Sequence, residues 1–240
     1  ALGTRIMLLR KKRGAGREMQ NNTIESMKRL SADIRIETIK ALTEAGYGHI
    51  GGSLSIADVL GVLYGGVMNV KPDDPEWEER DFLVLSKGHC GPGLYAALAL
   101  KGYFLMDFLK QINRIGTRLP SHCDRLKTPG IDMTTGSLGQ GTSLACGMAL
   151  GDRLKGRKNR VFLIVGDGEA DEGQVWEACM FASAKKLSNL VLLLDSNKKQ
   201  LDGPVKEILD PLDFTAKFEA FGFDTQTIYG HDVEALYNAL

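Results

Sequence analysis

The chain of 240 residues balances 30 basic against 30 acidic side chains, and it is 43% hydrophobic and 25% charged. This composition is ordinary for a globular protein, and its zero net charge gives no global field that would recruit nucleic acid or a membrane. No apolar run approaches the roughly 20 residues of a membrane span. The four cysteines lack the CxxC spacing of a zinc site or disulfide framework. We therefore expect a cytoplasmic protein without nucleic-acid or membrane partners.

The first 19 residues differ from the rest of the chain because basic side chains dominate them, namely Arg5, Arg10, Lys11, Lys12, Arg13 and Arg17. An RNA-binding arm or a targeting peptide is conceivable, but the apolar run at residues 6–9 is too short for a secretory core segment. We predict that residues 1–19 are a peripheral lead-in. Residues 20–240 are expected to form one domain, since no internal repeat or linker indicates a second.

Helix and strand signals alternate along that domain. The expected elements, in chain order, are a helix over 22–45, a glycine-rich loop over 46–52, a helix from 55, a strand over 82–85, a helix over 94–100, an irregular segment over 116–130, a helix over 145–150, a strand over 161–165, a helix over 173–187, a strand over 190–194, and a final helix, strand and helix over 214–223, 225–229 and 233–240. This alternation predicts an α/β fold with a doubly wound, mainly parallel sheet and helices on both faces.

Residues 161–203 carry the most specific chemistry. Their strand–helix–strand pattern predicts a right-handed parallel crossover, whose two strands end at the same edge of the sheet. Asp167 leaves the first strand and Asn197 the second, so adjacent strands would place the two side chains roughly 5 Å apart. One carboxylate and one amide oxygen suit Mg²⁺, and phosphate oxygens usually complete its shell. Gly168 would let the backbone approach a phosphate closely.

Simple turn formation is the alternative interpretation of both residues. Asp167 could be a turn residue near a helix start, and Asn197 a turn residue after a strand. The combination of GDG, a crossover helix and a late Asn favours a metal-bridged diphosphate site over that alternative.

The same combination resembles the thiamine diphosphate fingerprint, and three further motifs resemble the transketolase family. Residues 134–141 read TTGSLGQG, similar to the family's TTGPLGQG, with Ser137 in place of its common Pro. Gly48-His49-Ile50-Gly51 resembles the family's GHPG, and Ser86-Lys87-Gly88-His89 resembles its LSxGH. The four motifs occur in the family's order, and the resemblance runs from about residue 27 to the last residue.

The resemblance implies thiamine diphosphate and Mg²⁺ as cofactors. It assigns Asp167, Asn197 and the main-chain carbonyl of Lys199 to the metal. It places Gly168, Asn197 and His89 at the diphosphate, and it places Gly136, Ser137 and Leu138 at the thiamine. It also implies that His49 and His122 contact substrate and move protons. His122 is followed by Cys123, where the family usually has Pro.

A full transketolase has a second α/β domain, which supplies a glutamate and an aromatic residue to the cofactor's aminopyrimidine ring. The resemblance therefore implies the N-terminal subunit of a split transketolase, or a fragment of one. A C-terminal subunit would complete the site, with homodimerisation inside a heterotetramer. The implied reaction transfers a two-carbon ketol unit from a ketose, often phosphorylated, to an aldose.

Three alternatives stay open from the sequence. The chain could belong to another thiamine diphosphate enzyme, such as a deoxyxylulose phosphate synthase or a 2-oxoacid dehydrogenase component, although TTGSLGQG and LSKGH argue against both. It could bind cofactor without turnover of its own. His89-Cys90 and His122-Cys123 could bind zinc, but adjacent side chains on extended backbone point in opposite directions and make a poor tetrahedral set.

Overall fold

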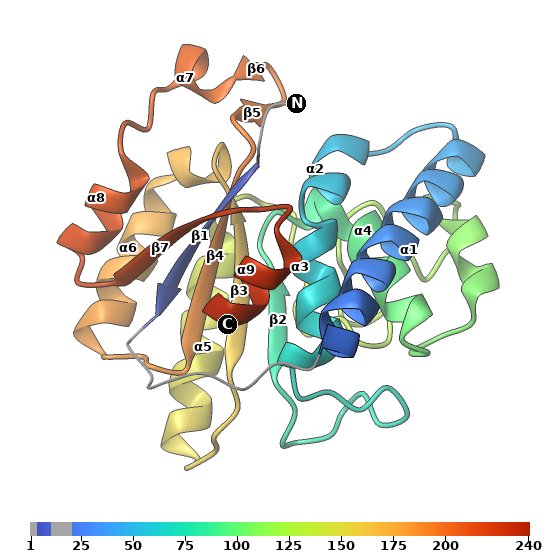
Figure 1. Cartoon of the computed structure of the whole chain (residues 1–240), viewed down its shortest axis with the longest axis horizontal. Coiled ribbons are helices and arrows are strands. Elements are labelled where there is room, and N and C mark those ends of the chain that lie inside the picture. Colours follow the sequence, from blue (N-terminus) through green and yellow to red (C-terminus); the bar gives the residue numbers. More distant parts are fainter. Residues whose placement is uncertain (1–3, 11–20) are drawn as a thin grey trace.

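A five-stranded sheet forms the centre of the protein (Figure 1). The computed structural model describes residues 4–10 and 21–240. The strand order is β2-β3-β4-β1-β7. The strands are β1 (Arg5–Arg10), β2 (Phe82–Leu85), β3 (Val161–Gly166), β4 (Leu190–Ser196) and β7 (Asp224–Tyr229), and a separate short ladder joins β5 (Lys199–Gln200) to β6 (Gly203–Pro204).

The sheet is mainly parallel. Strands β2, β3 and β4 run side by side in one direction, and Gly166 at the end of β3 pairs with Asp195 on β4. Strand β1 is antiparallel to both β4 and β7, so β7 runs in the same direction as β4. The predicted mainly parallel α/β sheet is therefore confirmed, with one antiparallel strand inside it.

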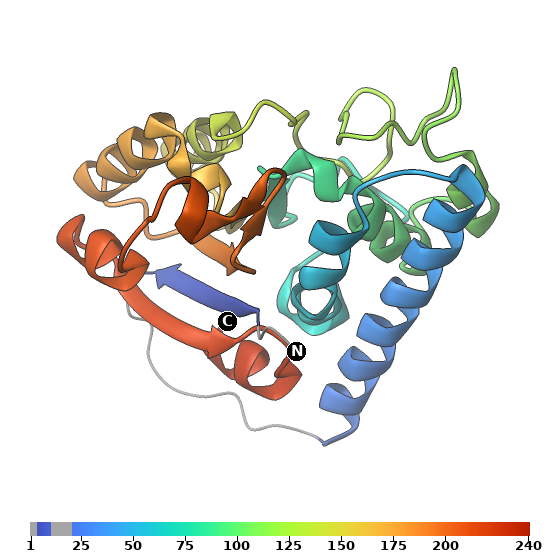
Figure 2. The ribbon, with the colours of Figure 1, turned by 90° about the horizontal axis from the view of Figure 1, so that it is seen from above.

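Helices cover both faces of the sheet. The helical elements are α1 (Asn21–Ala45), α2 (Ile50–Ser55), α3 (Ala57–Val62), η1 (Leu63–Val67), η2 (Gly88–Cys90), α4 (Gly91–Leu100), η3 (Met106–Gln111), α5 (Gln140–Leu154), η4 (Glu169–Asp171), α6 (Gly173–Ala184), α7 (Val205–Ile208), α8 (Phe214–Ala220) and α9 (Val233–Ala239). Seen from above, α1 (blue) and the pair α5 and α6 (yellow to orange) lie on opposite sides of the molecule (Figure 2). No helix of the described residues is long and apolar enough to cross a membrane.

Alternating side chains of the strands build two separate apolar cores. Phe162 and Ile164 of β3 pack with buried residues of α1, α3, α4 and α9. Leu163 and Val165 point to the other face, where they pack with buried residues of α5, α6 and α8. Every residue of β3 is buried, which explains why this strand reads as a continuous apolar run in the sequence.

Strand β1 corrects the prediction that residues 1–19 are peripheral. Residues Arg5–Arg10 lie inside the sheet between β4 and β7, and Ile6 and Leu8 are at most 1% exposed. The run at 6–9 is short for a targeting segment but long enough for a strand buried on both faces. The remainder of the predicted lead-in, residues 1–3 and 11–19, lies outside the described residues.

The loop around His49 is shorter than predicted. Helix α2 begins at Ile50, so Gly51 and Gly52 are helical rather than part of a flexible glycine loop. The single helix expected from residue 55 is divided into α2, α3 and the π-helical turn η1. Helix α6 ends three residues before the predicted end at 187, and Lys186 has a positive φ of 53°.

Candidate functional site at the carboxyl edge of the sheet

Asp167 and Asn197 follow directly on two paired strands. The backbone N–H of Asp167 donates to the carbonyl of Asp195, so the β3–β4 ladder extends to this position (3.1 Å). The Asp167 carboxylate accepts the backbone N–H of Gly168 (3.0 Å) and of Lys198 (2.5 Å). The carboxylate thus reaches the residue next to Asn197, as the parallel crossover predicts.

The turn after β4 has an unusual backbone. Lys198 has a positive φ of 64°, a region that residues other than glycine seldom adopt. This conformation directs the Lys198 N–H at Asp167, and the Asn197 Oδ1 accepts the N–H of Lys199 (2.9 Å). A strained turn that is held by site residues is typical of a functional edge.

The Asp167 carboxyl is only 2% exposed. Burial raises the pKa of Asp167 to about 6, the nearby Asp195 adds to the rise, and the two backbone N–H groups and Lys87 oppose it. A cation at this edge would favour the ionised form. The described residues contain no group of three or more His, Cys, Asp and Glu side chains that could hold a metal. A cation here would therefore need backbone and ligand oxygens besides the Asp167 and Asn197 side chains.

A buried ion pair lies beneath this edge. Lys87, 1% exposed, pairs with Asp195 of β4, which is fully buried. The Ser55 hydroxyl at the end of α2 donates to Asp195 Oδ2 (2.5 Å), whereas Oδ1 has no hydrogen-bond partner among the described residues. Burial alone would lower the pKa of Lys87, but the Asp195 charge outweighs it and raises that pKa above its usual value.

Three histidines from separate segments meet beside this pair. His49 precedes α2, His89 lies in η2, and His122 lies in the segment between η3 and α5. The ring centroids of His49 and His89 are 5.2 Å apart, and those of His49 and His122 are 5.8 Å apart. The structure thus brings together all three histidines that the resemblance assigned to substrate and cofactor.

Two histidines of the cluster, His89 and His122, have pKa values below the usual one. The pKa of His89 falls to about 4, chiefly through burial and then through the positive charge of Lys87 and the two neighbouring histidines. Burial and His49 also lower the pKa of His122. Neutral imidazoles can donate a proton from one ring nitrogen and accept one at the other, which suits proton transfer near neutral pH.

The TTGSLGQG segment packs against the SKGH segment. The Thr135 hydroxyl donates to the carbonyl of Leu85 (2.7 Å). A Cβ on Gly88 would lie 2.8 Å from the backbone N of Gly136, and one on Gly136 would lie 3.2 Å from the His122 ring. Glycine is therefore required at both positions for this close approach.

The rest of that segment lies at the same edge. Ser137 is exposed and Leu138 is half-buried. The Leu138 carbonyl accepts the Gln174 side chain (2.7 Å). A Cβ on Gly168 would lie 2.7 Å from the Cβ of Gln200, next to Lys199 in β5. The predicted site residues thus fall into two neighbouring groups, the Asp167–Asn197 edge and the histidine cluster, joined through Lys87 and Asp195.

Sequence reasoning missed four polar residues of this region. Ser55, Lys87, Glu169 and Asp195 are all buried, and none was assigned a role. Lys87 stands inside the recognised SKGH motif, and Glu169 directly follows GDG. The available signal was that both charged residues lie next to apolar strands. A charged side chain that is buried there needs a partner, because charged side chains are rarely buried unless they are paired.

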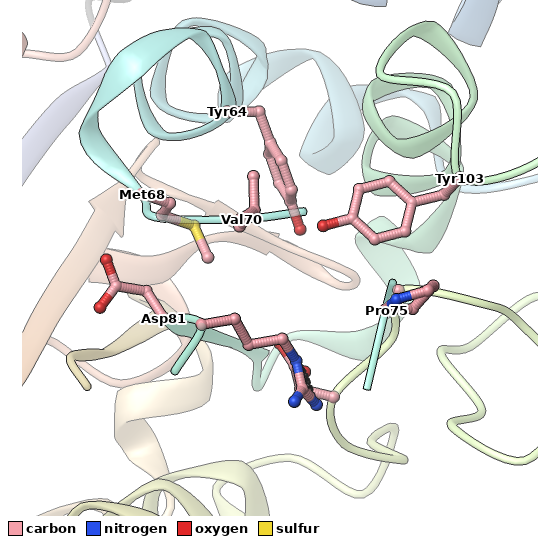
Figure 3. Close-up of a pocket in the computed structure, with 9 residues that line it drawn as sticks. Tyr64, Met68, Val70, Pro75, Asp81 and Tyr103 are labelled. Carbon is pink, nitrogen blue, oxygen red and sulfur yellow. Dashed lines mark hydrogen bonds and ion pairs between the residues drawn. The ribbon is translucent and has the colours of Figure 1, made fainter. Parts of the chain in front are cut away.

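A pocket lies at the amino end of β2, opposite the carboxyl edge (Figure 3). Tyr64, Tyr103 and Asp132 contribute to its lining. Asp132 pairs with Arg80 (3.0 Å), and burial raises the pKa of Asp132 to about 6. None of the predicted site residues lines this pocket.

Comparison with known proteins gives one family. Residues 26–240 match the sequence family described as "Transketolase, thiamine diphosphate binding domain". The chain is 53% identical over 209 residues to the 6-deoxy-6-sulfo-D-fructose transketolase subunit SqwG of Clostridium sp. (strain MSTE9), covering 86% of this chain and 75% of that protein. It is 40% identical over 208 residues to an apulose-4-phosphate transketolase subunit of Actinobacillus succinogenes, covering 86% of this chain and 74% of the relative.

Solved structures agree with these relatives. The transketolase from Campylobacter jejuni superposes with a TM-score of 0.82 at 30% identity, covering 92% of this chain and 35% of that one. A Pichia stipitis transketolase variant gives a TM-score of 0.83 at 29% identity, covering 90% of this chain and 33% of the other. The chain thus spans about a third of these solved chains and about three quarters of the related subunits.

Proposed function

Since this chain belongs to the transketolase family, we propose that it is the N-terminal, thiamine diphosphate-binding subunit of a split transketolase. The complex would transfer a two-carbon ketol unit from a ketose, often phosphorylated, to an aldose, often phosphorylated. The observation that carries this proposal is the pairing of Asp167 with the turn after Asn197, beside the cluster of His49, His89 and His122.

The donors at the edge fit Mg²⁺ and a diphosphate. Asp167, the Asn197 side chain and the Lys199 carbonyl would supply hard oxygen ligands, and phosphate oxygens would complete the shell. His89 and the close backbone at Gly168 would bind the diphosphate, and Gly136, Ser137 and Leu138 would contact the thiamine. When bound, thiamine diphosphate would supply a thiazolium ring that acts as an electron sink for the electron pair left on the two-carbon unit when its bond to the rest of the ketose breaks.

His49 and His122 would act on the substrate hydroxyls. Both rings are exposed at the surface of this chain and face each other across 5.8 Å. An imidazole at each position can hold a hydroxyl in place and take or return its proton. Such general acid–base assistance is typically worth about 10²–10⁴-fold in rate.

The α5–α6 face is the proposed homodimer surface within a heterotetramer. Leu144 of α5 is 38% exposed, and Met180 and Phe181 of α6 are 57% and 39% exposed. A Cβ on Gly147 or Gly151 would meet nothing within 4 Å, so a partner helix could approach closely. Exposed apolar side chains around small residues on packed helices are typical of a protein interface.

A C-terminal transketolase subunit is the proposed partner, and it would cover the histidine cluster and the cofactor. The proposal includes no nucleic-acid or membrane partner. It places the complex in the cytoplasm, since charged sugar phosphates do not cross a bilayer unaided. The names of the relatives suggest 6-deoxy-6-sulfo-D-fructose and apulose 4-phosphate as the first ketoses to test as donors.

Reconstitution tests the proposal. The chain is mixed with a candidate C-terminal subunit, Mg²⁺ and thiamine diphosphate, and ketol transfer from a panel of ketoses to aldose phosphates is followed by product analysis. We expect transfer that requires both subunits and is lowered about 10²-fold or more by His122→Asn, with cofactor affinity retained. Cofactor binding without transfer from any donor would replace this function with that of a cofactor-binding subunit.

A further inference from the structure

Glu169 is the carboxylate that connects the separate segments of this site. It is 3% exposed and lies two residues after Asp167. Its Oε1 accepts the Ser86 hydroxyl (2.5 Å) and the backbone N–H of Gly139 (2.8 Å). Its Oε2 accepts the backbone N–H of Gly166 (3.0 Å).

These three donors belong to three of the four motifs, SKGH, TTGSLGQG and GDG. Ser86 begins the SKGH segment, Gly139 follows the Gly136–Ser137–Leu138 stretch, and Gly166 ends β3 immediately before the Asp167 turn. Gly139 is 30 positions from Glu169, and Ser86 is 83 positions away. A single buried side chain therefore bridges all three segments.

The packing around Glu169 leaves little room for another arrangement. Gly139 has a positive φ of 82° where it precedes α5, which aims its N–H at the carboxylate. A Cβ on Gly141 would lie 2.4 Å from the Ser86 hydroxyl. The start of α5 and the SKGH segment are thus in direct contact, and Glu169 satisfies the polar groups at that contact.

We infer that Glu169 is a positioning residue for the thiamine half of the cofactor: it holds residues 136–138 against the diphosphate-binding edge. The inference rests on the proposed function. The Asp167 turn has its own supports, because its carboxylate and N–H bond to Gly168, Lys198 and Asp195. Loss of Glu169 would therefore affect the 136–138 segment more than the metal and diphosphate edge.

Only a carboxylate can accept from all three donors. Glutamine offers one acceptor oxygen, so its amide NH₂ would face either the Gly166 N–H or the pair formed by the Ser86 hydroxyl and the Gly139 N–H. Both orientations oppose a donor to a donor, and a buried unsatisfied donor destabilises that local arrangement. Glu169→Gln keeps the size of the side chain and removes only its ability to accept from both sides.

The test compares two probes on the complex of this chain with its partner subunit. Calorimetry measures the Kd of thiamine diphosphate and of inorganic pyrophosphate, each with Mg²⁺. We expect Glu169→Gln to weaken thiamine diphosphate binding by about tenfold or more, as for other residues that orient a ligand-binding group. Pyrophosphate affinity should remain unchanged. Unchanged thiamine diphosphate affinity, or an equal loss for both probes, would overturn the inference.

Two further variants keep the test decisive. Ser86→Ala removes one donor and should give a smaller loss of affinity, for thiamine diphosphate alone. If Glu169→Gln fails to fold, this variant decides: unchanged affinity for both probes in Ser86→Ala overturns the inference. Glu76→Gln makes the same chemical change at an exposed glutamate before β2 and should alter neither affinity. Binding is measured without turnover, so absence of ketol transfer by the wild-type complex would overturn the proposed activity and not the role of Glu169.

Discussion

The two ends of the parallel strands differ in the partners of their acidic side chains. Asp81 and Asp132 lie at the amino end, and Asp167 and Asp195 lie at the carboxyl end. At the amino end, Asp81 accepts the Arg160 guanidinium (2.7 Å) and the backbone N–H groups of Asn69 and Arg160. Asp132 is likewise held by Arg80 and by the N–H of Leu83. Each of these two carboxylates thus has both an arginine and backbone N–H donors.

At the carboxyl end, the described part of the chain leaves Asp167 and Asp195 less completely paired. Asp167 makes no ion pair there and is held by backbone N–H groups. Asp195 has Lys87 on one oxygen and no hydrogen-bond partner on the other. Buried charge without a full set of partners costs stability and is retained where it serves binding or catalysis. The comparison supports the proposed site at the carboxyl end of the sheet.

Removing the Asp167 charge should give the largest loss of cofactor affinity. We expect Asp167→Asn to lower Mg²⁺-dependent cofactor affinity by about 10²-fold or more, since a liganding carboxylate matters at least as much as the residues that orient it. EDTA should bring the wild type to the same level. The measurement is calorimetric titration with thiamine diphosphate at pH 7.5.

The same variant should fold normally. Because burial raises the pKa of Asp167 to about 6, its folded state favours the proton, and the ionised side chain costs stability as pH rises from about 4 to above 6. Asparagine removes that cost while leaving one backbone N–H unmatched, so we expect Tm within about 2–4 °C of the wild type, the shift that about 1 kcal/mol gives in a domain of 150–250 residues. Full cofactor affinity in Asp167→Asn would contradict the metal assignment.

Breaking the buried Lys87–Asp195 pair should give the largest loss of stability. Lys87→Met leaves Asp195 buried with only Ser55 as a side-chain donor. Such a change destabilises by about 3–5 kcal/mol, which urea unfolding would measure. The double variant Lys87→Met/Asp195→Asn removes both charges and should recover much of the loss. A fully stable Lys87→Met chain would show that the pair is not closed as the structure has it.

Asp81→Asn examines the amino end with a matched change. It removes the charge opposite Arg160, whose side chain is 26% exposed, from a carboxyl that is 5% exposed. We expect about 2 kcal/mol of lost stability, the range for hydrogen bonds to charged groups. Cofactor affinity per folded molecule should not change. A selective loss of cofactor affinity in Asp81→Asn would remove the distinction between the two ends.

The residues of the proposed site could be predicted from the sequence better than the strand and the buried charged residues that support them. Asp167 and Asn197 could be placed together because a parallel crossover brings both strand ends to one edge. Strand β1 could not, since a run of four apolar residues does not say which strands it will join. Lys87 and Asp195 are 108 positions apart, and Glu169 and Ser86 are 83 apart. A charged residue in a motif looks solvent-exposed until the fold brings such a partner to it.

The smallest predicted effect is a shifted titration of His89. Its pKa of about 4 means that between about pH 6.5 and pH 4 the unfolded chain takes up a proton that the folded chain refuses, so acid lowers stability through this residue. NMR of the ring protons, assigned with His89→Gln, should show its midpoint near pH 4. Lys87→Met should raise that midpoint, because the Lys87 charge opposes protonation and Asp195 favours it.

A neutral His89 at pH 7 would bind a diphosphate through one N–H rather than through a positive charge. The histidine itself should therefore add no pH dependence to cofactor binding above pH 6. A midpoint between pH 6 and 7 would mean that water and counter-charge reach the ring more freely than its packing beside Lys87 allows.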